Sequence, residues 1–163
     1  MNSDVSLEAR IRRLEDVEAI KRLIATYAIG ADRQNDPAVL RQIYADDAIW
    51  EAEGMMKFEG ADVLSRELHE FGKARIPWSL HYNTSPLVEV AEDGRTATMF
   101  WYVWEVANVT PEGGGTPAPS VVGGWYESWL RKFDDGWKFT HIKLFPKLFS
   151  PRNAPAWNLD PAD

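Results

Sequence analysis

The first third of the chain repeats apolar residues at spacings of three and four, which is typical of an amphipathic helix. The first such series begins at Leu7 and continues to Tyr27. Gly30 and the polar segment 31–35 indicate the end of this helix, because glycine favours helix termini and the segment contains turn-forming residues. We therefore expect Asp32 to lie in a loop that follows the helix.

Two further helices are expected before the midpoint of the chain. Asp36 as N-cap and Pro37 at the first helical position predict the start of the second helix. We expect that helix to end at Asp46-Asp47. Residues 61–74 are predicted to form the third helix, and its apolar side should consist of Val63, Leu64, Leu68 and Phe71.

From residue 78 onward the pattern is that of strands rich in β-branched and aromatic residues. Gly-containing turns at 92–94 (EDG) and 134–136 (DDG) indicate hairpins, whereas 110–120 (TPEGGGTPAPS) indicates a flexible loop. Long strands are predicted at 79–90, 96–109, 121–133 and 137–145, after two short strands at 48–51 and 58–59.

Helices followed by a strand meander predict an α+β fold. We expect a cone-shaped, strongly curved and mostly antiparallel sheet, with the N-terminal helices enclosing one apolar pocket. No repeat or linker divides the sequence, so residues 1–163 should form one domain with a core of about 7–148. The Pro- and Asn-rich segment 149–163, which carries Trp157, should be a tail that lies on this domain or on a neighbour.

Composition narrows the classes of function. The net charge of −7 argues against nucleic-acid binding, and the absence of cysteine excludes disulfides and a thiol nucleophile. The chain begins without an apolar signal core and has no run of about 20 apolar residues, so we expect a cytoplasmic protein that does not bind membranes. Eight Trp, seven Phe and five Tyr indicate a bulky core or a ring-lined cavity.

The three histidines are the first candidates for chemistry. His69 lies in a charged helical stretch and is expected at the surface. Because side chains alternate along a strand, His81, Asn83 and Ser85 should share one face. That face could meet water or a polar spot inside a pocket, and on spacing alone the first interpretation is favoured. No histidine or acidic cluster has metal-ligand spacing, so we expect no metal.

Tyr27 and Asp32 also allow two interpretations. Asp32 could be a turn former and Tyr27 a core ring. Alternatively, the two residues could join His81 in an acid–base set, because histidine titrates near neutral pH and a carboxylate can fix its tautomer. A tyrosine hydroxyl could polarise a carbonyl or assist a leaving oxygen.

Several segments between residues 7 and 150 together resemble the SnoaL-like family. They are 14–23 (LEDVEAIKRL) with Tyr27 and Asp32, 44–50 (YADDAIW), 58–60 (FEG), 80–84 (LHYNT), 124–129 (GWYESW) and 135–139 (DGWKF). This family shares the cone fold of nuclear transport factor and scytalone dehydratase. Its members also include bile acid dehydratase, polyketide cyclases, ketosteroid-type isomerases and gamma-hexachlorocyclohexane dehydrochlorinase.

The resemblance implies a histidine–aspartate dyad that abstracts a proton beside a leaving group, with His81 as base, Asp32 as its partner and Tyr27 as an assisting group. Relatives carry an arginine on the last strand, where this chain has His141 and Lys143 instead. Some carry a second acidic residue or histidine on the middle strand, where this chain has Trp101, Trp104 and Glu105. We expect substrate contacts from Trp50, Trp101, Trp104, Tyr126, His141 and Lys143.

The function expected from this resemblance is that of a cofactor-independent lyase, of dehydratase or dehydrohalogenase type, for a small apolar cyclic or polyketide- or steroid-like substrate. Isomerisation or polyketide cyclisation by the same base is an alternative, as is binding of a small apolar molecule without catalysis. The small subunit of a ring-hydroxylating dioxygenase is a further alternative with the same fold. A homo-oligomer, dimer or trimer, is expected because exposed Trp125 or Trp129 on the sheet would be buried against another copy.

Overall fold

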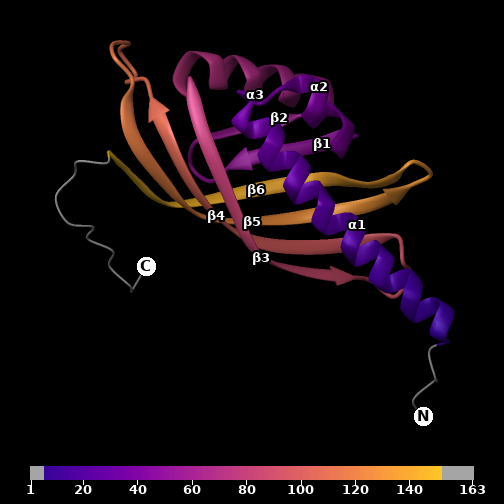
Figure 1. Ribbon diagram of the computed structural model, residues 1–163. Coiled ribbons are helices and arrows are strands. Elements are labelled where there is room, and N and C mark those ends of the chain that lie inside the picture. Colours follow the sequence, from indigo (N-terminus) through magenta and orange to yellow (C-terminus); the bar gives the residue numbers. More distant parts are fainter. Residues whose placement is uncertain (1–5, 152–163) are drawn as a thin grey trace.

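A computed structural model of the protein describes residues 6–151, which form an α+β fold (Figure 1). No helix in this range is both long and apolar enough to cross a membrane. The elements are α1 (Leu7–Asp32), α2 (Pro37–Leu40), the 3-10 turn η1 (Arg41–Ile43), β1 (Tyr44–Ala52), β2 (Met56–Glu59), α3 (Ala61–Arg75), β3 (Trp78–Val90), β4 (Thr96–Val109), β5 (Ala118–Phe133) and β6 (Gly136–Pro151).

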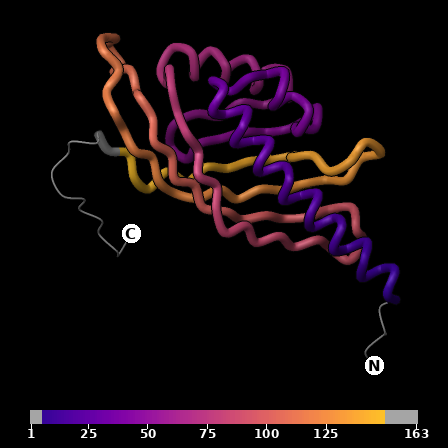
Figure 2. Tube along the Cα trace, viewed as in Figure 1, coloured from indigo at the N-terminus to yellow at the C-terminus, as the bar shows by residue number. Residues whose placement is uncertain are grey.

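The six strands form one strongly curved sheet in the order β2-β1-β6-β5-β4-β3. Strands β3 to β6 are the antiparallel meander that the turn signals predict. The sheet is nevertheless mixed, because β1 runs parallel to β6. Helix α1 crosses the concave face obliquely, and α3 lies over β1 and β2, so that the curved sheet and the helices have a cone-like arrangement (Figures 1 and 2).

Helix α1 is longer than its sequence indicates. It starts at the N-cap Ser6, whose side chain accepts a hydrogen bond from the Ala9 N–H, and it runs through Gly30 to Asp32. Gly30 is needed for packing: a Cβ there would lie 2.5 Å from Leu40 Cδ2, so glycine allows α2 to approach α1. The expectation of a loop at Asp32 is therefore wrong, and Asp32 is the last helical residue.

The predicted second helix is also wrong in its extent. The Asp36 side chain caps it through the Ala38 N–H as expected, but α2 ends at Leu40 and β1 begins at Tyr44. Asp46-Asp47 are exposed residues inside β1, at the irregularity where β1 joins β6. Pairing with β6, a distant segment, determines this boundary and leaves no local signal.

Helix α3 forms where expected, over Ala61–Arg75, and its buried side includes Leu64, Leu68 and Gly72. Val63, predicted on that side, is 40% exposed. At the other end of the chain β6 continues to Pro151, beyond the predicted strand end at residue 145. The rest of the expected tail, with Trp157, lies outside the described residues.

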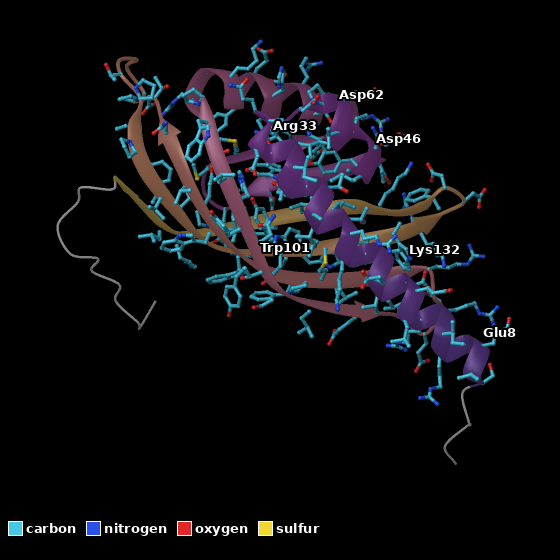
Figure 3. All side chains as sticks on the ribbon, in the orientation of Figure 1. Glu8, Arg33, Asp46, Asp62, Trp101 and Lys132 are labelled. Atoms are coloured by element: carbon cyan, nitrogen blue, oxygen red, sulfur yellow. The ribbon has the colours of Figure 1, made fainter. Side chains whose placement is uncertain are left out.

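Alternation along the strands gives the sheet two different faces. On β4, Met99, Trp101 and Val103 point into the core, and Trp101 is fully buried near the middle of the molecule (Figure 3). The convex face, on the other side, carries large exposed side chains, among them Leu80, Tyr82, Tyr102, Trp104 and Trp129. Both faces are therefore rich in aromatic residues.

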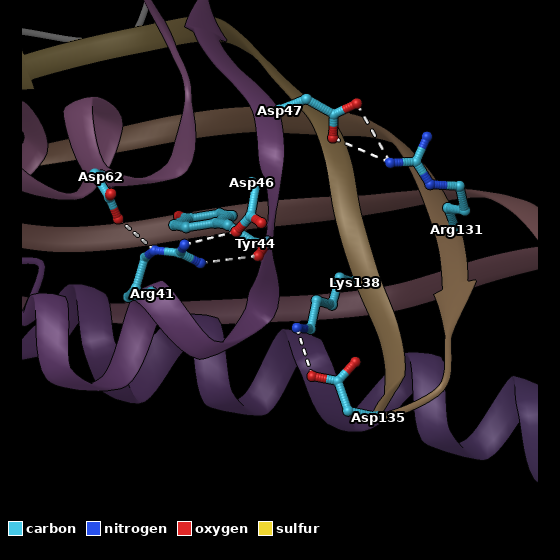
Figure 4. A network of polar contacts seen from close by, with 8 residues as sticks. All are labelled: Arg41, Tyr44, Asp46, Asp47, Asp62, Arg131, Asp135 and Lys138. Carbon is cyan, nitrogen blue, oxygen red and sulfur yellow. Dashed lines mark hydrogen bonds and ion pairs between the residues drawn. The ribbon is translucent and has the colours of Figure 1, made fainter.

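A polar network ties η1 to its neighbours at the surface (Figure 4). The Arg41 guanidinium donates to Asp62 at the start of α3 and to Asp46 of β1, each over 2.6 Å. It also donates to the Tyr44 carbonyl at 3.5 Å. Both carboxylates are mostly exposed, and exposed pairs contribute at most about 1 kcal/mol each. This network orients η1 more than it stabilises the fold.

Candidate active site

A cavity of about 110 Å³ opens between the concave face of the sheet, the end of α1 and helix α3. Its wall is largely apolar, with a few polar groups from α1, β3, β4 and β5. The lining residues include Tyr27, Ala31, Trp50, Met56, Leu68, Phe71, Ile76, Ser79, His81, Glu105, Val122, Tyr126 and Leu144. An apolar recess with convergent polar groups is the usual form of a small-molecule site.

His81 projects into this cavity from β3. Its side chain is 11% exposed, whereas its strand neighbours Leu80 and Tyr82 are exposed on the convex face. The favoured interpretation from spacing, that the His81 face meets water, is therefore wrong. Asn83 shares this inner side, but Ser85 is exposed at a bulge where its φ is 53°.

Asp32 holds His81 from the C-terminal end of α1. Its Oδ1 lies 2.8 Å from His81 Nδ1 and also accepts the His81 backbone N–H at 2.9 Å. A carboxylate only accepts hydrogen bonds, so Nδ1 must carry the proton of this contact. In the neutral ring Nε2 then has the free lone pair and can accept a proton.

Glu105 occupies the other side of the imidazole, and its Oε2 lies 3.5 Å from His81 Nε2. The residue is buried at 7% exposure. Burial raises the pKa of the Glu105 carboxyl, and a positive charge on His81, when the ring is protonated, lowers it. Glu105 was expected from the sequence only as part of the middle strand and not as a site residue. The available signal is its phase: Glu105 follows Trp101 and Val103 at spacings of two residues, so its side chain points to the same core-facing side of β4.

Tyr27 is part of a buried hydroxyl and indole network. Its Oη accepts from Trp50 Nε1 at 3.0 Å and lies 3.3 Å from the Tyr126 Oη. Burial raises the pKa of Tyr27 and raises that of Tyr126 well above its usual value. Both hydroxyls are therefore protonated at neutral pH and can donate hydrogen bonds.

The six expected substrate contacts divide between the two faces of the sheet. Trp50 and Tyr126 line the cavity. Trp101 lies behind the wall, stacked on Tyr126 with a centroid distance of 4.8 Å. Trp104 is 44% exposed on the convex face, because it is out of phase with Trp101 along β4.

His141 and Lys143 also lie outside the cavity. They alternate with Ile142, which is fully buried in the core, and so they project from the opposite face of β6. There His141 stacks on Trp129, and Lys143 pairs with Glu51 at 3.3 Å. His69, expected at the surface, is partly buried, with its Nδ1 2.8 Å from the Gln34 carbonyl oxygen.

The cavity therefore brings together a base, two carboxyl groups and two neutral phenols. His81 Nε2 can accept a proton, Asp32 can stabilise the resulting imidazolium, and Tyr27 can donate a hydrogen bond. The Glu105 carboxyl lies beside Nε2, and burial raises its pKa. Across residues 6–151, no three histidine or acidic side chains are arranged to hold a metal ion.

Comparison with known proteins agrees with this architecture. The model of the SnoaL-like domain family matches residues 12–143. No protein of curated function matches the sequence.

Solved structures match over nearly the whole chain. Hexachlorocyclohexane dehydrochlorinase LinA type 3 from Novosphingobium barchaimii LL02 is 23% identical with a TM-score of 0.78, covering 91% of this chain and 97% of its own. A protein described as a scytalone dehydratase from Novosphingobium aromaticivorans DSM 12444 is 20% identical with a TM-score of 0.75, covering 91% and 95%. An NTF2-like protein with a cystatin-like fold from Novosphingobium aromaticivorans is 22% identical with a TM-score of 0.66, covering 96% and 94%. At these identities the likeness shows the fold.

Proposed function

This chain belongs to the SnoaL-like domain family, and from that premise we propose that it is a cofactor-independent lyase of dehydratase or dehydrohalogenase type. The observation that carries the proposal is the 2.8 Å contact between His81 Nδ1 and Asp32 Oδ1 at the wall of an apolar cavity. A histidine held in one tautomer by a carboxylate, with its other nitrogen toward a cavity, is suited to general base catalysis.

In this mechanism His81 Nε2 abstracts a proton from carbon. Asp32 orients the ring through Nδ1 and stabilises the imidazolium that forms. The backbone N–H of His81 also donates to Asp32 Oδ1 at 2.9 Å, so the end of α1 and β3 are fixed to each other at the dyad. This second hydrogen bond limits movement of the carboxylate relative to the imidazole.

Tyr27 is the group we assign to the substrate's carbonyl or leaving oxygen. Trp50 Nε1 already donates to the Tyr27 Oη, which leaves the phenol proton available for a substrate or for Tyr126. Because burial raises the Tyr27 pKa, the phenol keeps its proton at neutral pH. It can therefore stabilise negative charge on a carbonyl oxygen when His81 removes the neighbouring proton.

The cavity favours a compact and largely apolar substrate. Small-molecule pockets typically measure about 300–1,000 Å³, and this one measures about 110 Å³. Within the expected range of substrates, these dimensions support a single ring over a polyketide- or steroid-sized skeleton. Trp50, Phe71 and Tyr126 offer flat surfaces for such a ring.

The test uses two probes with the same ring, β-hydroxycyclohexanone and β-acetoxycyclohexanone, and follows formation of the enone. We expect His81→Ala and Asp32→Asn each to lower kcat/KM by about 100- to 1,000-fold, the size of a general-base contribution. His141→Gln is the matched control, since it removes a histidine of the convex face, and should retain turnover. Unchanged turnover in both His81→Ala and Asp32→Asn would contradict the proposal.

Isomerisation or cyclisation would use the same base, and only the products differ. Loss of water or acetate, measured with enone formation, separates elimination from a rearrangement that retains all atoms of the substrate. Recovery of every bound probe unchanged would favour a binding protein without catalysis.

Self-association is also part of this proposal. The convex face exposes Tyr82, Tyr102, Trp104 and Trp129, each at 40% or more. Aromatic side chains gathered on one face favour burial against another copy. This face lies opposite the cavity, so such an assembly would leave the His81 side of the sheet free.

A further inference from the structure

Glu105 has the position and surroundings of a proton donor inside the cavity. Its side chain is 9% exposed, and its Oε2 lies 3.5 Å from His81 Nε2. The second oxygen, Oε1, is buried and has no hydrogen-bond partner within residues 6–151. A buried carboxyl oxygen that carries charge without a partner is costly. A proton on Glu105, or a hydrogen-bonding group of a substrate beside it, removes that cost.

The two carboxyl groups beside His81 differ in their partners. Asp32 accepts two N–H hydrogen bonds, which is the arrangement of an ionised carboxylate. Glu105 faces a largely apolar cavity, and burial raises its pKa; a positive charge on His81 lowers that pKa, and the charge of Asp32 raises it. His81 therefore lies between one ionised carboxylate and one carboxyl group that retains its proton more readily.

We propose that Glu105 is the general acid of this site, which protonates the leaving hydroxyl, so that the reaction is loss of water from an uncharged alcohol. This inference rests on the proposed function, in which His81 is the base. It selects dehydration over dehydrohalogenation and names the substrate class: a small, uncharged carbonyl compound with a hydroxyl on the β carbon.

The step balances within the cavity. His81 Nε2 takes the proton of the C–H bond, and the electron pair of that bond forms the C=C bond as the C–O bond breaks. The Glu105 proton joins the departing oxygen, so water leaves. His81 is then protonated and Glu105 ionised. Transfer of the proton from Nε2 to Oε2, which are 3.5 Å apart, restores both groups without a co-reactant.

The leaving group decides whether the Glu105 proton is needed. Hydroxide leaves poorly unless it is protonated, so loss of water from an uncharged alcohol uses this proton. A halide departs as an anion and does not need it. A buried carboxyl group that retains its proton therefore favours a hydroxyl over a halide as the leaving group of this site.

The first experiment examines the proton and needs no substrate. Infrared difference spectra of wild type against Glu105→Gln, recorded at neutral pH in water and in deuterium oxide, report the carbonyl stretch of a protonated carboxyl group. We expect a band that shifts in deuterium oxide and is missing from Glu105→Gln. The matched control is Glu51→Gln, a carboxyl group on the convex side of the sheet paired with Lys143, which should keep the band.

The second experiment compares the two cyclohexanone probes. Hydroxide is a poor leaving group that needs a proton, whereas acetate leaves without one. We expect Glu105→Gln to lower kcat/KM for the β-hydroxy probe by about 100-fold or more and to change that for the β-acetoxy probe by no more than a few-fold. Glu105→Asp, which keeps a carboxyl group, should recover part of the β-hydroxy activity.

Three results would overturn this inference. Absence of the protonated-carboxyl band in wild type removes the donor. Equal losses for both probes in Glu105→Gln mean that Glu105 only positions His81. Elimination of acetate alone by wild type excludes dehydration but leaves His81 as the base. Failure of the proposed function is distinguishable, because His81→Ala would then retain turnover of the β-acetoxy probe.

Discussion

Helix α1 carries two buried or partly buried carboxylates that face the sheet, and their surroundings differ. Asp16, in the first half of the helix, accepts from Lys132 Nζ at 2.7 Å and from Trp137 Nε1 at 2.8 Å. Lys132 lies beside this half of α1 (Figure 3). Asp32, at the end of the helix, accepts from the backbone N–H and the Nδ1 of His81.

The partners determine what each carboxylate can do. An ammonium group and an indole N–H only donate hydrogen bonds, so the Asp16 contacts join α1 to β5 and β6 without a proton acceptor. The imidazole beside Asp32 has a second nitrogen, and that nitrogen lies toward the cavity and Glu105. The same residue type on one helix is therefore structural at one end and suited to catalysis at the other.

Loss of the Asp16 contacts should reduce the stability of the fold. Asp16→Ala removes both hydrogen bonds and leaves the buried Trp137 N–H without its acceptor, so we expect the free energy of unfolding to fall by about 2 kcal/mol. Urea unfolding measures the loss, and turnover of the β-acetoxy probe per folded molecule should stay unchanged. The matched control is Glu15→Ala, an exposed neighbour on α1, with an expected change within about 0.5 kcal/mol.

The comparison fails if Asp16→Ala lowers turnover of the folded protein as strongly as Asp32→Asn does. It also fails if Asp16→Ala leaves the unfolding curve unchanged, because the Lys132 and Trp137 contacts would then contribute nothing to the stability of the packing of α1 on β5 and β6.

A smaller effect concerns the pH dependence of stability. Because burial raises the Glu105 pKa above its ordinary value of 4.5, the folded state binds the proton more tightly than the unfolded state. The Glu105 contribution to stability is then complete below pH 4.5 and is lost as the pH rises through the folded-state pKa. Urea unfolding across this range should show a weaker decline in Glu105→Gln than in wild type.

The groups that face Glu105 are His81 and Asp32, with Tyr27 and Tyr126 farther along the wall. Glu51→Gln, which leaves this set intact, should follow the wild-type pH dependence. Parallel curves for wild type and Glu105→Gln would show that Glu105 does not differ in proton affinity between the two states.

Much of the fold could be predicted from local pattern, because hairpin turns and strand alternation depend on neighbouring residues. The starts and ends of elements were harder. Tyr44 begins a strand because β1 pairs with β6, and Gly30 lies inside α1, where it allows the close approach of Leu40 of α2, and does not end the helix. Both causes join segments that are separate in the sequence.

The candidate site was harder to predict than the fold, because both faces of the sheet carry aromatic residues. On β3 the apolar Leu80 and the aromatic Tyr82 have the composition of a face that packs on the core, although they are exposed. The polar His81 has the composition of a solvent-facing position, although it lines the cavity. Alternation shows that neighbours point in opposite directions, but it does not show which direction is inward. For the same reason Glu105 was not expected in the site, whereas Trp104 was.

Removal of a proton from carbon by His81 can be measured without a leaving group, by hydrogen exchange. In deuterium oxide, a protein that acts on cyclohexanone as a base can only exchange the hydrogens beside its carbonyl, which proton NMR follows. We expect wild type to accelerate this exchange and His81→Ala to lower the acceleration by about 100-fold or more. Equal exchange rates with wild type and His81→Ala would contradict this role of His81.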